Sequence, residues 1–121
     1  MARILVMEDD PSFRNAVRVV LEAAGYEVIE AADGAAGLRL YHEQGADVIL
    51  VDIFMPERDG LEVIRALQVQ APRAKIIAMS GGGTTLKISL LDEAAALGAS
   101  RTLSKPFPPS ALLKAIRELL D

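Results

Sequence analysis

Five polar residues of the sequence stand where short apolar runs end, and their chemical types suggest a shared site. The acidic pair Glu8-Asp9 follows the first apolar run, Asp52 closes a later one, and Ser80 and Lys105 follow two more. An apolar run bounded by turn residues predicts a strand buried on both faces, as in a parallel sheet. Ligands of open parallel sheets bind at the carboxyl ends of the strands. If these strands are neighbours, the five side chains meet at one edge.

Three carboxylates, a hydroxyl and an ammonium in one site suit a divalent cation and a phosphoryl group. Carboxylates held close together raise one another's pKa unless a cation relieves the repulsion. A site of oxygen atoms with few protein ligands suits Mg²⁺, which keeps bound waters and accepts phosphate oxygens. We therefore expect Mg²⁺-dependent phosphoryl chemistry at this edge of the sheet.

The elements that position these residues follow from hydrophobic periodicity and turn signals. Strands are expected at Arg3–Met7, Tyr26–Glu30, Val48–Asp52, Ala74–Met79 and Ala99–Leu103, and helices at 11–24, 34–45, 60–70, 86–97 and 109–120. Five strands, each followed by a helix after a short turn, predict one doubly wound parallel sheet, an α/β fold of flavodoxin-like type. Its strand order of 2-1-3-4-5 places the strands that end in the five polar residues side by side.

Composition narrows the class of protein. A chain of 121 residues with 51% apolar residues predicts a single ordered domain, residues 1–121. The lack of cysteine excludes disulfides and thiolate metal sites. A net charge of −4 without a basic stripe argues against direct nucleic-acid binding. No signal-peptide core or membrane-spanning run is present, so we expect a cytoplasmic protein that does not enter the membrane.

The motifs together resemble the receiver domain of response regulators in two-component signalling, and the resemblance covers the whole chain. The matching features are the acidic pair Glu8-Asp9, the strand that ends in Asp52, the MPERDG turn, Ser80-Gly81 and the segment Lys105-Pro106-Phe107. Each motif is unspecific alone, but their order and spacing together are characteristic.

This resemblance implies a role for each site residue. A histidine kinase or phosphotransfer protein would phosphorylate Asp52, and the domain would catalyse only its own phosphorylation and dephosphorylation. Glu8, Asp9 and Asp52 would bind Mg²⁺ together with the backbone carbonyl of Phe54. Ser80 and Lys105 would contact the phosphoryl oxygens, and the modified domain would then switch its contacts with a downstream protein.

Two other functions are weaker alternatives. A haloacid-dehalogenase-type phosphatase also uses an aspartate at a strand end, but it requires an acid/base aspartate two residues later, where this chain has Phe54. A flavodoxin-like flavin carrier would share the fold, but no tryptophan and only two tyrosines are available to stack on the flavin ring.

Several other residues have structural interpretations. Asp10 precedes Pro11 and is expected to cap the first helix. Met7, Met55 and Met79 are expected to fill the core, and His42, the only histidine, to lie on the surface rather than to donate phosphate.

The switch region departs from the family pattern. Thr102 stands three residues before Lys105, where receivers commonly carry an aromatic residue, and a glycine-rich loop, Gly81–Thr85, follows Ser80. We expect phosphorylation to order this loop and shift the fourth helix. If Leu90, Ala94 and Leu97 of that helix face the core, then Ile88, Leu91 and Ala95 face outward. This strip, on the face between the fourth and fifth helices, suits a partner or a second copy of the domain, or it packs under the loop.

Overall fold

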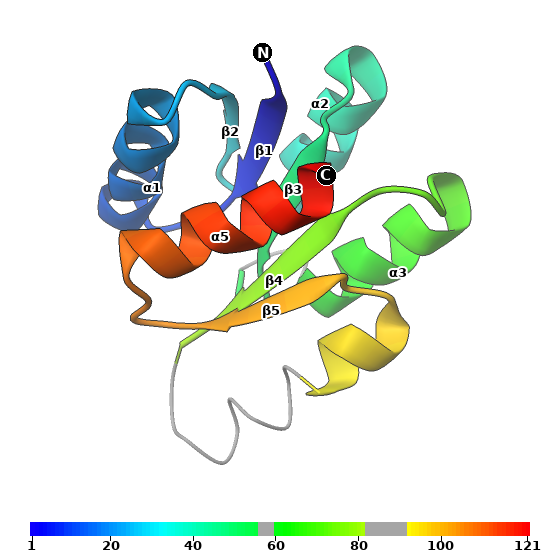
Figure 1. The fold of residues 1–121 in the computed structure, drawn as a ribbon. Coiled ribbons are helices and arrows are strands. Elements are labelled where there is room, and N and C mark those ends of the chain that lie inside the picture. Colours follow the sequence, from blue (N-terminus) through cyan, green and yellow to red (C-terminus); the bar gives the residue numbers. More distant parts are fainter. Residues whose placement is uncertain (56–59, 82–91) are drawn as a thin grey trace.

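The sheet is the central element of the structure, a computed structural model that describes residues 1–55, 60–81 and 92–121. Five strands run parallel, and their order across the sheet is β2-β1-β3-β4-β5 (Figure 1). They are β1 (Arg3–Met7), β2 (Glu27–Ala31), β3 (Val48–Asp52), β4 (Ile76–Ser80) and β5 (Arg101–Ser104). The predicted doubly wound α/β fold and its strand order are therefore confirmed.

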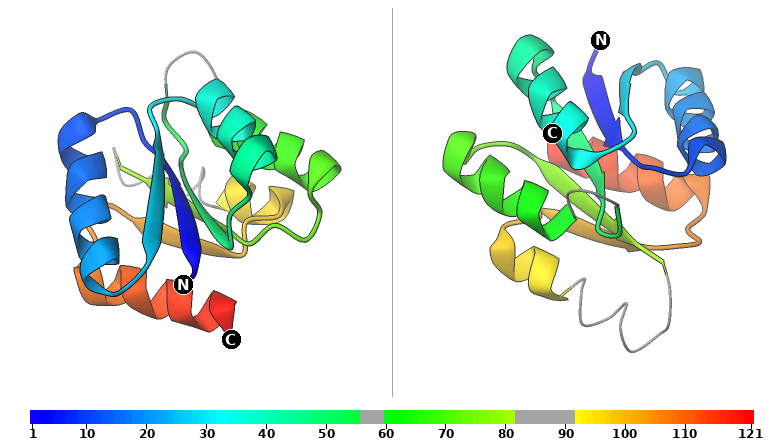
Figure 2. Two further views of the ribbon diagram at one scale, coloured as in Figure 1. Left: turned by 90° about the horizontal axis from the view of Figure 1, so that it is seen from above. Right: turned by 180° about the vertical axis from the view of Figure 1, so that it is seen from behind.

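Helices cover both faces of this sheet. They are α1 (Pro11–Ala23), α2 (Gly34–Gln44), α3 (Gly60–Gln70) and α5 (Pro109–Leu120), and residues 92–97 are also helical. Figure 2 shows α1 and α5 on one face, with α2, α3 and residues 92–97 on the other. Among the described residues, no helix is long and apolar enough to cross a membrane.

Alternate residues of the inner strands supply the two halves of the core. Leu5 and Met7 of β1 pack with α2 and α3, whereas Ile4 and Val6 pack with α1 and α5. Strands β3 and β4 alternate in the same way, and all their residues are buried. Neighbouring side chains of a strand point to opposite faces, so a strand covered on both faces needs an uninterrupted apolar run.

Local sequence signals fix the ends of the helix next to the acidic pair. The Asp10 carboxylate accepts hydrogen bonds from the backbone N–H groups of Ser12 (2.9 Å) and Phe13 (3.4 Å), which confirms its predicted capping role. Pro11 occupies the first helical position, where a missing N–H costs nothing. Gly25 has a φ of +92° just beyond the helix, a conformation that favours glycine.

Three strands lie slightly later in the chain than the sequence predicts. β2 begins at Glu27 rather than Tyr26, β4 at Ile76 rather than Ala74 and β5 at Arg101 rather than Ala99, and each ends one residue later. The backbone N–H of Ala74 donates to the carbonyl of Ala71 at 2.9 Å, and that of Ala99 donates to the carbonyl of Ala94 at 3.0 Å. Because these amides close turns, they do not join the sheet, although their side chains are apolar.

The methionines and the histidine lie where the sequence predicts. Met7, Met55 and Met79 are buried, and His42 is exposed, with its Nε2 atom 2.5 Å from the side-chain oxygen of Gln70. The predicted core positions of the three methionines and the predicted surface position of His42 are therefore confirmed.

The helical face of residues 92–97 agrees with the prediction as far as the structure describes it. Ala94 is buried, Leu97 is partly buried against the core and Ala95 is exposed. The loop after Gly81 and the residues Ile88, Leu90 and Leu91 lie outside the described residues. Loop ordering and the apolar strip therefore stay predictions.

Candidate functional site

The strand register brings the predicted site residues to one edge of the sheet. Asp52 is the last residue of β3 and pairs with Met79 of β4, one residue before Ser80. Glu8 directly follows β1, the neighbour of β3. Lys105 directly follows β5, and its backbone N–H donates to the carbonyl of Ser80 at 2.8 Å. The polar residues at the ends of β1, β3, β4 and β5 therefore lie side by side at the same edge of the sheet.

The three acidic residues form a cluster there. One carboxylate oxygen from each of Glu8, Asp9 and Asp52 lies within 4.8 Å of the others. Glu8 and Asp52 are only 1% and 4% exposed, whereas Asp9 is exposed to solvent. A small hard cation that takes a few carboxylate oxygens and keeps its remaining waters fits such a half-open set of ligands. The donor set thus suits Mg²⁺.

The electrostatics of Glu8 point to the same conclusion. Burial raises the pKa of the Glu8 carboxyl from its ordinary value of 4.5 to about 7, and the neighbouring Asp52 adds to the rise, whereas Lys105 opposes it. The attraction of the nearby Lys105 ammonium is therefore too weak to offset the effects of burial and of Asp52 on this pKa. A divalent cation bound between the carboxylates would relieve this excess of negative charge.

Lys105 is held between the carboxylates and an aromatic ring. Its Nζ atom lies 2.5 Å from Oε1 of Glu8 and 3.5 Å from Oδ2 of Asp52. It also lies 4.2 Å from the ring centroid of Phe13, and the edge-to-face ring of Phe107 packs against Phe13 with centroids 5.8 Å apart. A cation over an aromatic face is attracted by the ring electrons. The Phe13 ring, against which Phe107 packs, therefore attracts the ammonium in addition to the two carboxylates.

Ser80 and Phe54 lie next to this cluster. Ser80 is fully buried, and its hydroxyl donates to the carbonyl of Gly81 at 3.2 Å. The backbone N–H of Phe54 donates to Oδ1 of Asp52 at 3.2 Å, while the Phe54 side chain is 44% exposed. Because the Ser80 hydroxyl donates to Gly81, it must rotate away before it can donate to another acceptor. Thr102 is exposed on the edge strand β5.

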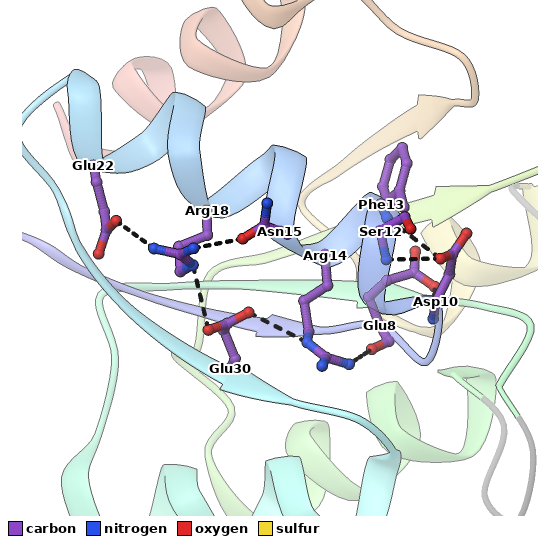
Figure 3. Close-up of polar contacts among 9 residues, drawn as sticks. All are labelled: Glu8, Asp10, Ser12, Phe13, Arg14, Asn15, Arg18, Glu22 and Glu30. Carbon is purple, nitrogen blue, oxygen red and sulfur yellow. Dashed lines mark hydrogen bonds and ion pairs between the residues drawn. The ribbon is translucent and has the colours of Figure 1, made fainter.

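Two contacts of the site were not foreseen from the sequence. Phe13 lies over Lys105, and the Nη1 atom of Arg14 donates to the backbone carbonyl of Glu8 at 2.8 Å (Figure 3). Both residues belong to the first turns of α1, directly after the acidic pair, which is a weak sequence signal. The direction of a side chain across two elements emerges only when α1 is packed on the sheet.

Comparisons with known proteins point to one family of signalling domains. A family model described as the response regulator receiver domain matches residues 4–117. Chemotaxis protein CheY of Thermotoga maritima is 33% identical over 118 residues, which is 97% of this chain and 96% of that protein. The DNA-binding dual master transcriptional regulator RpaA of Synechocystis is 35% identical over 99% of this chain, but over only 49% of its own length. This chain thus spans nearly all of some relatives and about half of others.

Two solved structures share the fold of this chain. The receiver domain protein of Clostridium thermocellum superposes with a TM-score of 0.92 at 29% sequence identity, covering 99% of this chain and 94% of that one. A CheY-like receiver domain protein of Methanospirillum hungatei gives a TM-score of 0.90 at 30% identity, covering 100% and 94%. The similarity therefore extends over the whole chain rather than a shared core alone.

Proposed function

This chain belongs to the response regulator receiver family and serves as a receiver in phosphorelay signalling, and from that premise we propose that Asp52 is its phosphoacceptor. The observation that carries the proposal is the position of Asp52, which is buried at the carboxyl end of the central strand, within one cluster with Glu8 and Asp9 and 3.5 Å from the Lys105 ammonium. We further propose that residues 1–121 form one receiver domain, since the family model spans nearly all of them.

The proposed reaction is a transfer between two proteins. A carboxylate oxygen of Asp52 attacks the phosphorus of a phosphohistidine on a histidine kinase or phosphotransfer protein. A phosphorus–oxygen bond forms while the phosphorus–nitrogen bond breaks, and the departing imidazole keeps the electron pair and takes up a proton. Such transfer needs mainly positioning and electrostatic stabilisation from the protein, which the fixed groups around Asp52 supply.

Lys105 and Ser80 are assigned to the phosphoryl oxygens. The Lys105 ammonium already lies between Glu8 and Asp52, so a short movement brings it to an oxygen that gains negative charge during transfer. Asp52 pairs with Met79 of β4, and Ser80 is the next residue of that strand. Rotation about the Cα–Cβ bond of Ser80 would turn its hydroxyl from Gly81 to the acyl phosphate. Its rotamer would then report the modification to the segment that follows β4.

Glu8, Asp9 and Asp52, with the backbone carbonyl of Phe54, are proposed to hold Mg²⁺. The fit rests on the oxygen-only donor set and on the raised pKa of the Glu8 carboxyl, which marks an excess of negative charge. When bound, Mg²⁺ would neutralise charge on the carboxylates and on the phosphoryl oxygens.

Receivers pass their signal through protein contacts, and we propose the same for this chain. Its partners would be a histidine kinase or phosphotransfer protein and, in the cytoplasm, a downstream protein or a second copy of the domain. The proposed output face is the one between the helix containing residues 92–97 and α5. On that helix Ala95 is exposed. Neither the phosphatase nor the flavin-carrier alternative is favoured by the family match.

A labelling experiment tests the acceptor. The protein is incubated with Mg²⁺ and acetyl phosphate, and acid-labile phosphate is mapped by mass spectrometry. We expect modification at Asp52, none in Asp52→Asn, and an unchanged rate in the control Asp92→Asn, which alters an exposed aspartate of the 92–97 helix. Uptake by Asp52→Asn at the wild-type rate would show that another residue is the acceptor.

A further inference from the structure

Every polar group of Glu8 has a partner. Its backbone N–H donates to the carbonyl of Ala31 at 3.0 Å, and its backbone carbonyl accepts from Nη1 of Arg14 at 2.8 Å. Its carboxylate accepts from Nζ of Lys105 at 2.5 Å and from the backbone N–H of Asp10 at 3.2 Å. Because Glu8 is only 1% exposed, these protein groups must take the place of water. Of the two contacts made by the Glu8 backbone, the one with Arg14 comes from a charged side chain.

Arg14 is itself held in place by the neighbouring edge strand. Its Nε atom lies 3.3 Å from Oε1 of Glu30 in β2, and its side chain is 21% exposed (Figure 3). A guanidinium group is planar and presents its N–H groups in a fixed fork. The contact of Nε with Glu30 therefore sets the direction of Nη1, which donates to Glu8. Strand β2, helix α1 and the end of β1 are joined through one side chain.

Asp9 depends on this arrangement because no described residue makes a polar contact with its side chain. Within the part of the chain that the structure describes, the Asp9 carboxylate accepts no hydrogen bond and forms no ion pair. The residues on both sides are fixed, Glu8 by the four contacts above and Asp10 by its capping bonds to α1. The place of Asp9 in the acidic cluster is therefore set by the backbone that Arg14 clamps.

We propose that Arg14 is a positioning residue that holds the Glu8-Asp9 backbone in the geometry needed for cation binding, with Glu30 fixing the direction of its guanidinium. This inference rests on the proposed function of the acidic cluster. Groups that orient the ligands of a metal contribute strongly to its affinity although they do not touch it. A positive charge acting only through space would have the opposite effect, since it repels a cation.

The same helix offers a matched control. Arg18 lies one turn further along α1 and also contacts Glu30, with Nε 3.5 Å from Oε2, and its other guanidinium nitrogens contact Glu22 and Asn15. Among the described residues it has no contact with Glu8. Arg14→Met and Arg18→Met therefore remove the same charge and one contact with Glu30, but only Arg14→Met frees the Glu8 carbonyl.

The test measures Mg²⁺ affinity of the unphosphorylated protein by calorimetry or by NMR titration at constant ionic strength. Arg14→Met is expected to weaken binding by about 10-fold or more, the range found for partners of metal ligands, whereas Arg18→Met leaves it unchanged. Arg14→Lys keeps the charge but cannot make both contacts, so it should weaken binding as well. In the apo protein, the amide NMR signals of Asp9 and Asp10 should shift in Arg14→Met and not in Arg18→Met.

The possible results separate this inference from the function on which it rests. Equal Mg²⁺ affinities of Arg14→Met and Arg18→Met, or tighter binding by Arg14→Met, would overturn the positioning role and leave Arg14 as a clamp between α1 and β2. If the wild-type protein itself binds no Mg²⁺ and takes up no phosphate at Asp52, the proposed function fails and the positioning role falls with it. Should Arg14→Met not fold, Arg14→Lys alone decides by the same criterion.

Discussion

Replacing Glu8 by glutamine should change how the stability of the protein depends on pH. Glu8 is the least exposed carboxyl of the acidic cluster, and burial together with Asp52 raises its pKa from 4.5 to about 7 in the folded protein. The folded state therefore holds the proton more tightly than the unfolded state. As the pH rises from 4.5 to 7, the unfolded chain ionises first, and the free energy of unfolding of the wild type falls.

The size of this loss follows from the two pKa values. One pKa unit corresponds to about 1.4 kcal/mol, so the complete loss is about 3 kcal/mol and is reached just above pH 7. Glu8→Gln cannot ionise and lacks this contribution. The attraction of Lys105 for the ionised carboxylate is already included in the pKa of about 7, so the pH dependence of the difference between the two proteins reports the titration of Glu8.

Urea unfolding followed by circular dichroism, in the presence of a chelator, measures the effect between pH 4.5 and pH 7.5. From pH 4.5 to pH 7.5, the free energy of unfolding of Glu8→Gln should rise by about 3 kcal/mol relative to that of the wild type. Both proteins are also measured with His42→Gln, because His42 is the only histidine of the chain. Mg²⁺ should stabilise the wild type more at pH 7.5 than at pH 5, since the cation binds the ionised carboxylates.

Parallel stability curves for the two proteins would refute this reasoning. They would mean that Glu8 ionises in the folded protein as easily as in the unfolded chain, so that water or Lys105 compensates for burial completely. The acidic cluster would then hold no excess of negative charge, and the electrostatic part of the case for a cation site would be lost.

Two further substitutions test how the Lys105 ammonium and Asp52, the proposed acceptor, are held. Phe13→Leu removes the ring face below Lys105, worth about 1 kcal/mol or about fivefold in the rate of phosphorylation by acetyl phosphate; Phe13→Tyr should keep the rate, and equal rates for the two variants would exclude a role for the ring. A Cβ in Gly60→Ala would collide with the backbone of Asp52, so stability should fall by roughly 1–3 kcal/mol with slower phosphorylation. In the control Gly37→Ala the collision is with the flexible Met7 side chain, so phosphorylation should be unaffected; equal rates in both glycine variants would contradict the prediction.

The fold was predictable because its strands carry strong signals. The fully buried strands β3 and β4 are continuous apolar runs, and each stops at a polar residue, Asp52 or Ser80, that marks the carboxyl edge. Turn amides were harder to predict. Ala74 and Ala99 look like strand residues by composition, and only the hydrogen bonds of their backbones to preceding turns exclude them from the sheet.

Within the site, the sequence predicted which residues come together but not all of the contacts between their side chains and those of neighbouring residues. Polar residues at neighbouring strand ends must lie close together, which is why the cluster of Glu8, Asp9 and Asp52 was expected. The contacts of Phe13 with Lys105 and of Arg14 with the Glu8 carbonyl join elements by side-chain direction. That direction depends on how α1 packs on the sheet, and no spacing within the sequence encodes it directly.

The position of Lys105 shows how charge balance in the cluster bears on phosphoryl transfer. Its ammonium lies 2.5 Å from Glu8 but 3.5 Å from Asp52, so Glu8 holds it more closely than Asp52, the proposed acceptor, does. Because both attractions act on one ammonium, weakening the negative charge on Glu8 shifts the balance towards Asp52. The Phe13 ring, whose centroid lies 4.2 Å from the ammonium, is a third group that attracts it. The buried Glu8 carboxylate, which should cost the folded protein stability near neutral pH, therefore also restrains Lys105. Lowering its charge would free the Lys105 ammonium for the phosphoryl oxygens of the proposed transfer.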